Sequence, residues 1–113
     1  MTPTAEWEFV AGHTHDDRVT SVGIHLEGEI DSERLNKWVS KLLREQGTDI
    51  FRMKGILNIK GAENRFVFQG VHMLFDGRED RPWGAVPRAN DLVFIGRKLD
   101  REALTRGFTR CLA

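Results

Sequence analysis

The chain has 113 residues, of which 40% are hydrophobic and 30% are charged, as in an ordinary globular protein. This length suits one domain and is too short for two hydrophobic cores. Seventeen basic residues balance seventeen acidic ones, so the basic excess typical of nucleic-acid-binding proteins is missing. The apolar runs are far shorter than the roughly 20 residues that cross a bilayer. We therefore expect a single domain with neither a nucleic acid nor a membrane as its partner.

The first residues and the cysteine count both favour a cytoplasmic location. The segment at residues 1–6 has neither a basic start nor an apolar stretch, so we expect no signal peptide. Cys111 is the only cysteine in the sequence. An intramolecular disulfide is therefore excluded, and so is a structural zinc site built from several thiolates.

Residues 1–18 are predicted to be a leader or linker with a His-x-His motif, and residues 19–113 are predicted to form the domain. The leader contains His13 and His15, followed by Asp16. Imidazole and carboxylate groups suit zinc, so these three residues are the candidate metal ligands. Two histidines without a third fixed ligand would bind zinc weakly, and a solvated linker is the competing interpretation.

From residue 19 on, the hydrophobic pattern predicts a strand and then a helix. Apolar residues alternate with polar residues or glycine over residues 22–26, which indicates a half-buried strand. Asp31 is a suitable N-cap for the helix that follows, whose apolar residues recur at helical spacing. We expect that helix to end at Gly47 with a left-handed C-cap.

Three further strands are predicted after this helix. Residues 51–60 alternate between apolar and charged or polar side chains, with Ile50 and Ile56 expected on the charged face. A hairpin turn follows at residues 61–64. Residues 66–75 are apolar on both faces, as in a central strand.

The glycines and prolines of residues 76–90 indicate a loop. Residues 92–96 are then the last strand, and Asp100 caps a second amphipathic helix. The resulting order, β-α-β-β-β-α, predicts an α+β domain in which an antiparallel sheet of about four strands carries both helices on one face. The other face of the sheet would be free to act as a docking surface.

Motifs of known enzymes are missing from the sequence. It contains no Gly-x-x-x-x-Gly-Lys-Ser/Thr phosphate loop and no Gly-x-Ser-x-Gly elbow. Cys111 lies on the apolar face of the second predicted helix, where a buried thiol is inert. A small enzyme with a pocket between sheet and helices is disfavoured, because apolar residues fill both helix stripes evenly. We therefore expect a protein that is not an enzyme.

Four segments together resemble the C-terminal domain of CobW-type GTPases. They occur in the order found in that family, and the resemblance extends from Asp16 to Leu112. The four segments are Asp49–Leu57, Arg65–His72, Arg81–Gly84 and Asn90–Arg97.

The resemblance implies a role in metal trafficking. Members of the family bind and hydrolyse GTP in an N-terminal domain and act as metal chaperones or insertases, for zinc or for cobalt in cobalamin synthesis. Their C-terminal domain contributes to the recognition of partners or clients. By this resemblance, the chain is a non-catalytic accessory domain that contacts a GTPase domain, in cis or in trans, and a metalloprotein client. No cofactor is required on this hypothesis.

The chain lacks the GTPase portion of that family, which is compatible with an excised fragment and with a stand-alone domain. A different hypothesis is a small zinc carrier that uses His13 and His15. It predicts zinc binding that depends on both histidines.

The candidate partner contacts are Arg52, Lys54, Trp83 and Arg88. Arg52 and Lys54 project from one face of a strand, where they are either solvated or paired with the carboxylates of a partner. Arg88, in the predicted loop, could join them. Trp83 is either an exposed aromatic contact or a lid that holds the loop to the sheet.

Two further histidines, His25 and His72, show no pattern that indicates a function. His72, in the predicted central strand, is expected to be buried against the sheet. It could act together with His25 only if their strands pair in the right register. His25 by itself is expected on the solvated face.

Overall fold

The computed structural model describes residues 18–71 and 74–113. These residues form five strands and two helices. In chain order the elements are β1 (Val19–Leu26), α1 (Ser32–Gln46), β2 (Ile50–Leu57), β3 (Asn64–Val71), β4 (Leu74–Pro82), β5 (Asn90–Arg97) and α2 (Arg101–Thr109). The candidate metal ligands His13, His15 and Asp16, as well as His72, lie outside the described residues.

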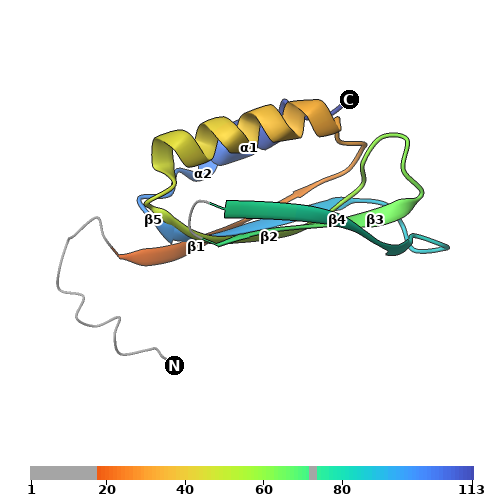
Figure 1. The fold of residues 1–113 in the computed structure, drawn as a ribbon, viewed down its shortest axis with the longest axis horizontal. Helices are drawn as coiled ribbons and strands as arrows, with labels where there is room; N and C mark the ends of the chain where they lie inside the picture. The colour runs from red at the N-terminus through yellow and green to blue at the C-terminus, as the bar shows by residue number, and fades with distance from the viewer. Residues whose placement is uncertain (1–17, 72–73) are drawn as a thin grey trace, which may run out of the picture.

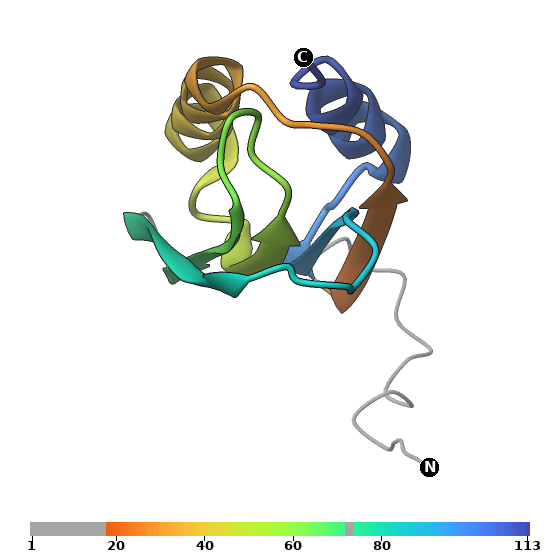
Figure 2. The same cartoon turned by 90° about the vertical axis from the view of Figure 1, so that its right-hand side faces the viewer.

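The strands form one sheet in the order β1-β5-β2-β3-β4, and every neighbouring pair is antiparallel. Both helices lie on the same face of this sheet (Figure 1). Seen along the strands, α1 and α2 lie side by side above the sheet (Figure 2). The predicted α+β class, the antiparallel sheet and the placement of both helices on one face are confirmed.

The sheet has one strand more than the sequence pattern predicted. The expected single strand at residues 66–75 is in fact the hairpin of β3 and β4, in which Gly70 pairs with Phe75. Most of β4 was expected to be loop, because it is an edge strand whose exposed positions carry charged residues. Natural edge strands are often charged, which discourages pairing with another chain. Such a strand shows little hydrophobic alternation.

Both helices begin at the predicted aspartates. The Asp31 carboxylate accepts hydrogen bonds from the backbone N–H groups of Glu33 and Arg34, each at 3.0 Å. The Asp100 carboxylate accepts one from the N–H of Ala103 at 3.1 Å. Helix α1 ends at the residue before Gly47, as predicted. The predicted left-handed cap is wrong, however, because Gly47 has φ −59° and its N–H still bonds to the carbonyl of Leu43.

The hydrophobic core fills the space between the sheet and the helices. It contains the apolar stripes of both helices and the inward-facing residues of β1, β2, β3 and β5. Ile50 also belongs to this core, although it was expected on the charged face. A β-bulge between Ile50 and Arg52 shifts the alternation by one residue and turns Ile50 toward the helices.

A short segment between β1 and α1 ties together parts of the chain that are distant in sequence. The N–H of Ile30 donates to the carbonyl of Asn58, and its carbonyl accepts from the N–H of Lys60. On the other side, Asp31 N–H donates to the carbonyl of Cys111. This segment therefore links the β2–β3 turn to the end of the chain.

Candidate interaction surface

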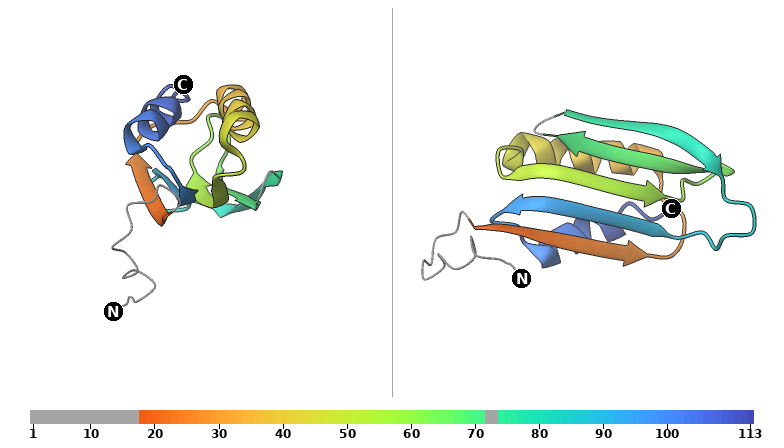
Figure 3. Two further views of the ribbon diagram at one scale, coloured as in Figure 1. Left: turned by 90° about the vertical axis from the view of Figure 1, so that its left-hand side faces the viewer. Right: turned by 90° about the horizontal axis from the view of Figure 1, so that it is seen from below.

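One face of the sheet is not covered by any helix in the described part of the chain, and it is seen from below in the right-hand view of Figure 3. We call the centre of this face, formed by β2 and β5, the open face. The register places Arg52 beside Ile95 and Lys54 beside Val93. A shallow hollow of about 330 Å³ lies over these positions. The residues that define the open face are Arg52, Lys54, Ile56, Asp91, Val93 and Ile95.

The open face carries apolar side chains that are exposed to solvent. Val93 is 42% exposed and Ile95 is 38% exposed. On the next strand, β3, Val71 is paired with Arg52 and is also exposed. These positions lie on three adjacent strands, with Arg52 of β2 between Ile95 and Val71, so they form a patch of mixed apolar and basic character. Such patches on protein surfaces often mark sites of contact with other molecules.

Two cations in this patch have no ion-pair partner in the described part of the chain. Arg52 and Lys54 are exposed, and neither forms an ion pair with any residue that the structure describes. Two other arginines of the sheet are paired: Arg65 with Asp80 at 2.7 Å, and Arg97 with Asp49 at 2.8 Å. Arg52 and Lys54 therefore remain available to carboxylates of another molecule.

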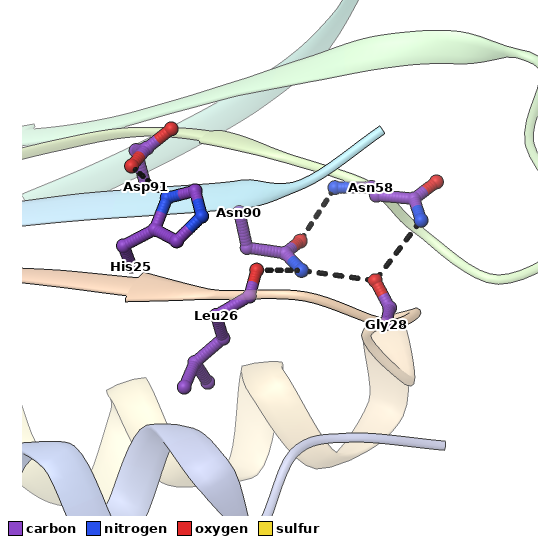
Figure 4. Close-up of polar contacts among 6 residues, drawn as sticks. All are labelled: His25, Leu26, Gly28, Asn58, Asn90 and Asp91. Atoms are coloured by element: carbon purple, nitrogen blue, oxygen red, sulfur yellow. Dashed lines mark hydrogen bonds and ion pairs between the residues drawn. The ribbon is translucent and has the colours of Figure 1, made fainter. Parts of the chain in front are cut away.

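A histidine–carboxylate pair lies at one corner of the open face. The Nδ1 atom of His25, on β1, is 2.7 Å from Oδ1 of Asp91, on β5 (Figure 4). The hydrogen bond to the Asp91 carboxylate, together with its negative charge, raises the pKa of His25 above its ordinary value of 6.5. His25 was expected on the solvated face, and Asp91 was not among the predicted site residues. Nothing in the sequence pattern shows that these two strands are neighbours.

A buried asparagine lies directly behind this corner (Figure 4). Asn90 is fully buried, and its side-chain oxygen accepts a hydrogen bond of 2.7 Å from the backbone N–H of Asn58. Its amide nitrogen donates to the carbonyls of Leu26 and Gly28. Asn90 therefore joins the ends of β1, β2 and β5 and fixes the edge of the open face.

The other two predicted contact residues lie outside the hollow. Trp83 is only 5% exposed, so the prediction of an exposed aromatic side chain is wrong. Its backbone N–H donates to the carbonyl of Glu63, next to the β2–β3 turn, which agrees with the alternative that Trp83 holds the loop in place. Arg88 is exposed, and its guanidinium donates to the carbonyl of Ala62 at the same end of the sheet.

Among the described residues, no group of three or more potential ligands is placed to hold a metal ion. The site predicted at His13, His15 and Asp16 lies outside this part of the chain and stays a prediction. Cys111 is buried, as expected, and burial raises the pKa of its thiol to about 11. No helix in the described part is both long and apolar enough to cross a membrane.

The fold and the family match define this chain as a CobW-type C-terminal domain. A family model described as the cobalamin synthesis protein cobW C-terminal domain matches residues 19–112, and the chain belongs to this family. The resemblance inferred from the four sequence segments is thereby confirmed.

Two curated relatives are zinc chaperones. The chain is 33% identical over 102 residues to the zinc chaperone YjiA of Escherichia coli, a match that covers 90% of this chain and 31% of that protein. It is 31% identical over 107 residues to the zinc chaperone CobW of Sinorhizobium sp, with 92% and 30% covered. The chain thus spans about a third of the length of these relatives.

Solved structures of YjiA share the fold of this chain. The crystal structure of the Zn(II)-bound YjiA GTPase from Escherichia coli superimposes with a TM-score of 0.80 at 30% identity, covering 99% of this chain and 35% of that chain. A Zn(II)-bound triple mutant of the YjiA GTPase gives a TM-score of 0.81 over the same shares.

Proposed function

We propose that this chain is the non-catalytic accessory domain of a CobW-type metal-trafficking GTPase and that it makes protein contacts through its open face. The partners are the GTPase domain, in cis or in trans, and a metalloprotein client that receives zinc or cobalt in the cytoplasm. One observation carries the proposal: Arg52 and Lys54 have no ion-pair partner among the described residues, and they lie beside exposed apolar side chains on the face of the sheet opposite the helices. The names of the relatives supply the link to metal trafficking.

The chemistry of the open face favours a partner surface that combines carboxylates with apolar groups. The guanidinium of Arg52 can pair with a carboxylate through two parallel hydrogen bonds, and the Lys54 ammonium adds a second positive charge. Burying Val93 and Ile95 against a partner would contribute roughly 25 cal/mol for each Å² of apolar surface removed from water. Charge pairing and apolar burial would occur at the same place, because Arg52 and Lys54 are the cross-strand neighbours of Ile95 and Val93.

A binding experiment with the GTPase portion of YjiA, prepared without its own C-terminal third, tests the proposal. Isothermal titration should detect binding to this chain, and the double variant Arg52→Glu, Lys54→Glu should lower the affinity by about tenfold or more, equivalent to about 1.4 kcal/mol. The matched control is Arg44→Glu, Lys60→Glu, which reverses two exposed cations outside the open face. Equal losses in both variants would contradict the assignment of the contact to the open face.

Hydrolysis of GTP gives an independent check on the non-catalytic assignment. Because the sequence has no phosphate loop, the purified chain should not hydrolyse GTP. Turnover that persists through purification to homogeneity would contradict the proposal.

A zinc carrier that uses His13 and His15 is the second candidate, because both curated relatives are named zinc chaperones. A competition titration with a zinc indicator separates the two functions. The accessory-domain proposal requires no cofactor and expects at most weak zinc binding. Tight stoichiometric binding that is lost in His13→Ala, His15→Ala and kept in His25→Ala would support the carrier.

A further inference from the structure

The helical side of the domain carries a groove that the proposed function does not use. It has a volume of about 490 Å³ and runs between α1 and α2. Figure 2 and the left-hand view of Figure 3 show the two helices side by side on the face of the sheet opposite the open face. A ligand in this groove would therefore not touch Arg52 or Lys54.

The floor of the groove is largely apolar. It includes Trp38 and Leu42 from α1 and Leu104 from α2. The Trp38 ring is half-buried, and it stacks on Phe108 with 5.9 Å between the ring centroids. Gly107 also lines the groove, and because it has no side chain the indole packs directly against the backbone of α2. The floor suits apolar side chains of a partner.

The rim of the groove is strongly basic. It carries five cations and two carboxylates, and none of the seven forms an ion pair with a residue in the described part of the chain. One of the carboxylates, Asp100, is already engaged as the N-cap of α2. The five cations are Arg34, Lys37 and Lys41 on α1 and Arg106 and Arg110 on α2.

This concentration of positive charge is local. The formal net charge of the whole chain is zero, yet the cations line both sides of one apolar groove. Desolvated carboxylates of a partner would pair with them more strongly than fully hydrated ones. An acidic molecule with an apolar side therefore complements both parts of the groove.

We propose that the groove between α1 and α2 binds an acidic amphipathic helix of a partner protein. Its apolar stripe would lie on Trp38, which is half-buried, whereas Leu42 and Leu104 are buried below the surface; its acidic residues would face the cations of the rim. A helix that lays its apolar face into a hydrophobic groove is a recurring mode of recognition. Because α1 and α2 already touch through Trp38 and Gly107, the bound helix would lie on the outer side of these two helices.

The geometry favours such a segment over a small anion or a nucleic acid. Arg34 and Lys41 are seven residues apart on α1, which at 1.5 Å per residue is about 10 Å, more than a single phosphate covers. The apolar part of the floor offers no hydrogen-bond donor to a phosphate backbone.

A synthetic peptide of about 14 residues, with leucines at helical spacing and glutamates elsewhere, is the probe. In a ¹H–¹⁵N NMR titration of the full chain, we expect the resonances of the Trp38 indole and of the Leu104 and Gly107 amides to shift. The amide resonances of Val93 and Ile95 should not change. Two control peptides are matched to the probe, one with lysine in place of glutamate and one with serine in place of leucine. Both should bind at least about tenfold more weakly.

Charge reversal in the protein provides the complementary experiment. The variant Lys37→Glu, Lys41→Glu, Arg106→Glu should lose affinity for the acidic peptide by about tenfold or more and gain affinity for the lysine peptide. The control Arg52→Glu, Lys54→Glu should bind the acidic peptide as the unchanged protein does. If the open face does not bind the GTPase portion, the proposed function fails, but binding of the peptide in the groove is unaffected. The two proposals are therefore tested separately.

Three results would overturn the inference. Shifts confined to the open face would place the peptide elsewhere. Equal binding of the serine peptide or of a single-stranded oligonucleotide would show a general anion-binding surface. Concentration-dependent shifts of Trp38 and Gly107 without any peptide would show that a second copy of this chain occupies the groove. The titration of the unchanged protein decides among these even if the triple variant does not fold.

Discussion

Asn90 shows how a single polar side chain can organise the edge of a sheet. Its amide group makes three hydrogen bonds to backbone groups, two of them at the end of β1 and just after it and one in the turn after β2. Because the side chain is fully buried, water cannot replace any of these bonds. Asn90 therefore helps to hold Leu26, Gly28 and Asn58 in place, together with the hydrogen bond from the Asn58 side chain to the carbonyl of Gly28.

Replacing Asn90 with leucine should destabilise the domain by about 3 kcal/mol, because it leaves buried backbone donors and acceptors without partners. Urea denaturation measures the change in the free energy of unfolding. The control Asn36→Ala removes an exposed asparagine from α1 and should change this free energy by less than about 0.5 kcal/mol. A loss below about 1 kcal/mol for Asn90→Leu would show that the hydrogen bonds contribute little.

His25 should titrate above its ordinary pKa because of Asp91. The folded-state pKa is raised, so the stabilisation from this pair is fully present below the unfolded-state pKa near 6.5. It is lost as the pH rises through the folded-state pKa. An NMR titration of the His25 ring should show the raised pKa, and Asp91→Asn should lower it. A pKa of His25 that is the same in both proteins would rule out the pair in solution.

At the scale of elements, the contact between α1 and α2 depends on a residue without a side chain. Gly107, within α2, faces Trp38 so closely that an added Cβ would lie 2.5 Å from Cε2 of the indole. Trp38 in turn stacks on Phe108 and meets Phe94 edge to face. An added methyl group would therefore disturb the packing of three aromatic rings.

Gly107→Ala should destabilise the domain by about 1–2 kcal/mol, although alanine is the better helix former by up to about 1 kcal/mol. Thermal unfolding followed by circular dichroism measures the effect. Gly23→Ala is the matched control, because a Cβ there meets its nearest atom, Cγ2 of Val93, only at 4.0 Å. An increase in stability for Gly107→Ala would mean that the helices separate without cost.

The helices and three of the strands could be predicted because their signals are local. Asp31 and Asp100 cap the helices through groups two or three residues away, and β2 alternates residue by residue except at its bulge. Strand β4 escaped prediction because an edge strand that faces solvent needs no apolar face. Ile50 was assigned to the wrong face because a β-bulge changes the alternation, and the residue types alone do not reveal a bulge.

The candidate surface was predictable to the same extent. Arg52 and Lys54 were found because they alternate with buried residues on their own strand. Their apolar neighbours Val93 and Ile95 were not, since the pairing of β2 with β5 joins segments about 40 residues apart. The burial of Trp83 could not be predicted either, because it depends on how a loop folds back onto the β2–β3 turn.

At the scale of the whole molecule, the thiol of Cys111 reports on global unfolding. It is buried at the end of α2, and its Sγ donates to the carbonyl of Gly107 at 3.4 Å. The carbonyl of Cys111 is bound by the N–H of Asp31 on the other side. With a pKa of about 11, very little thiolate forms near neutral pH.

A disulfide reagent such as Ellman's reagent should therefore react with Cys111 in the native chain at least about 100-fold more slowly than in the unfolded chain at the same pH. The urea concentration at which labelling accelerates should match the unfolding midpoint. As a control, Lys41→Cys in a Cys111→Ser background places the thiol at an exposed position and should react quickly in the native state. Fast labelling of native Cys111 would show that the end of α2 opens independently.

The strand order has a consequence for how the chain folds during its synthesis. Strand β5, near the end of the chain, lies between the first two strands and is the partner of both. Before residues 90–97 are free to pair, the β2–β3–β4 meander can already form, but β1 has no neighbouring strand among the described residues. Until β5 arrives, β1 and one edge of β2 are exposed, and unpaired strand edges of this kind promote aggregation. The insertion of one late strand completes the sheet and removes both of these edges at once.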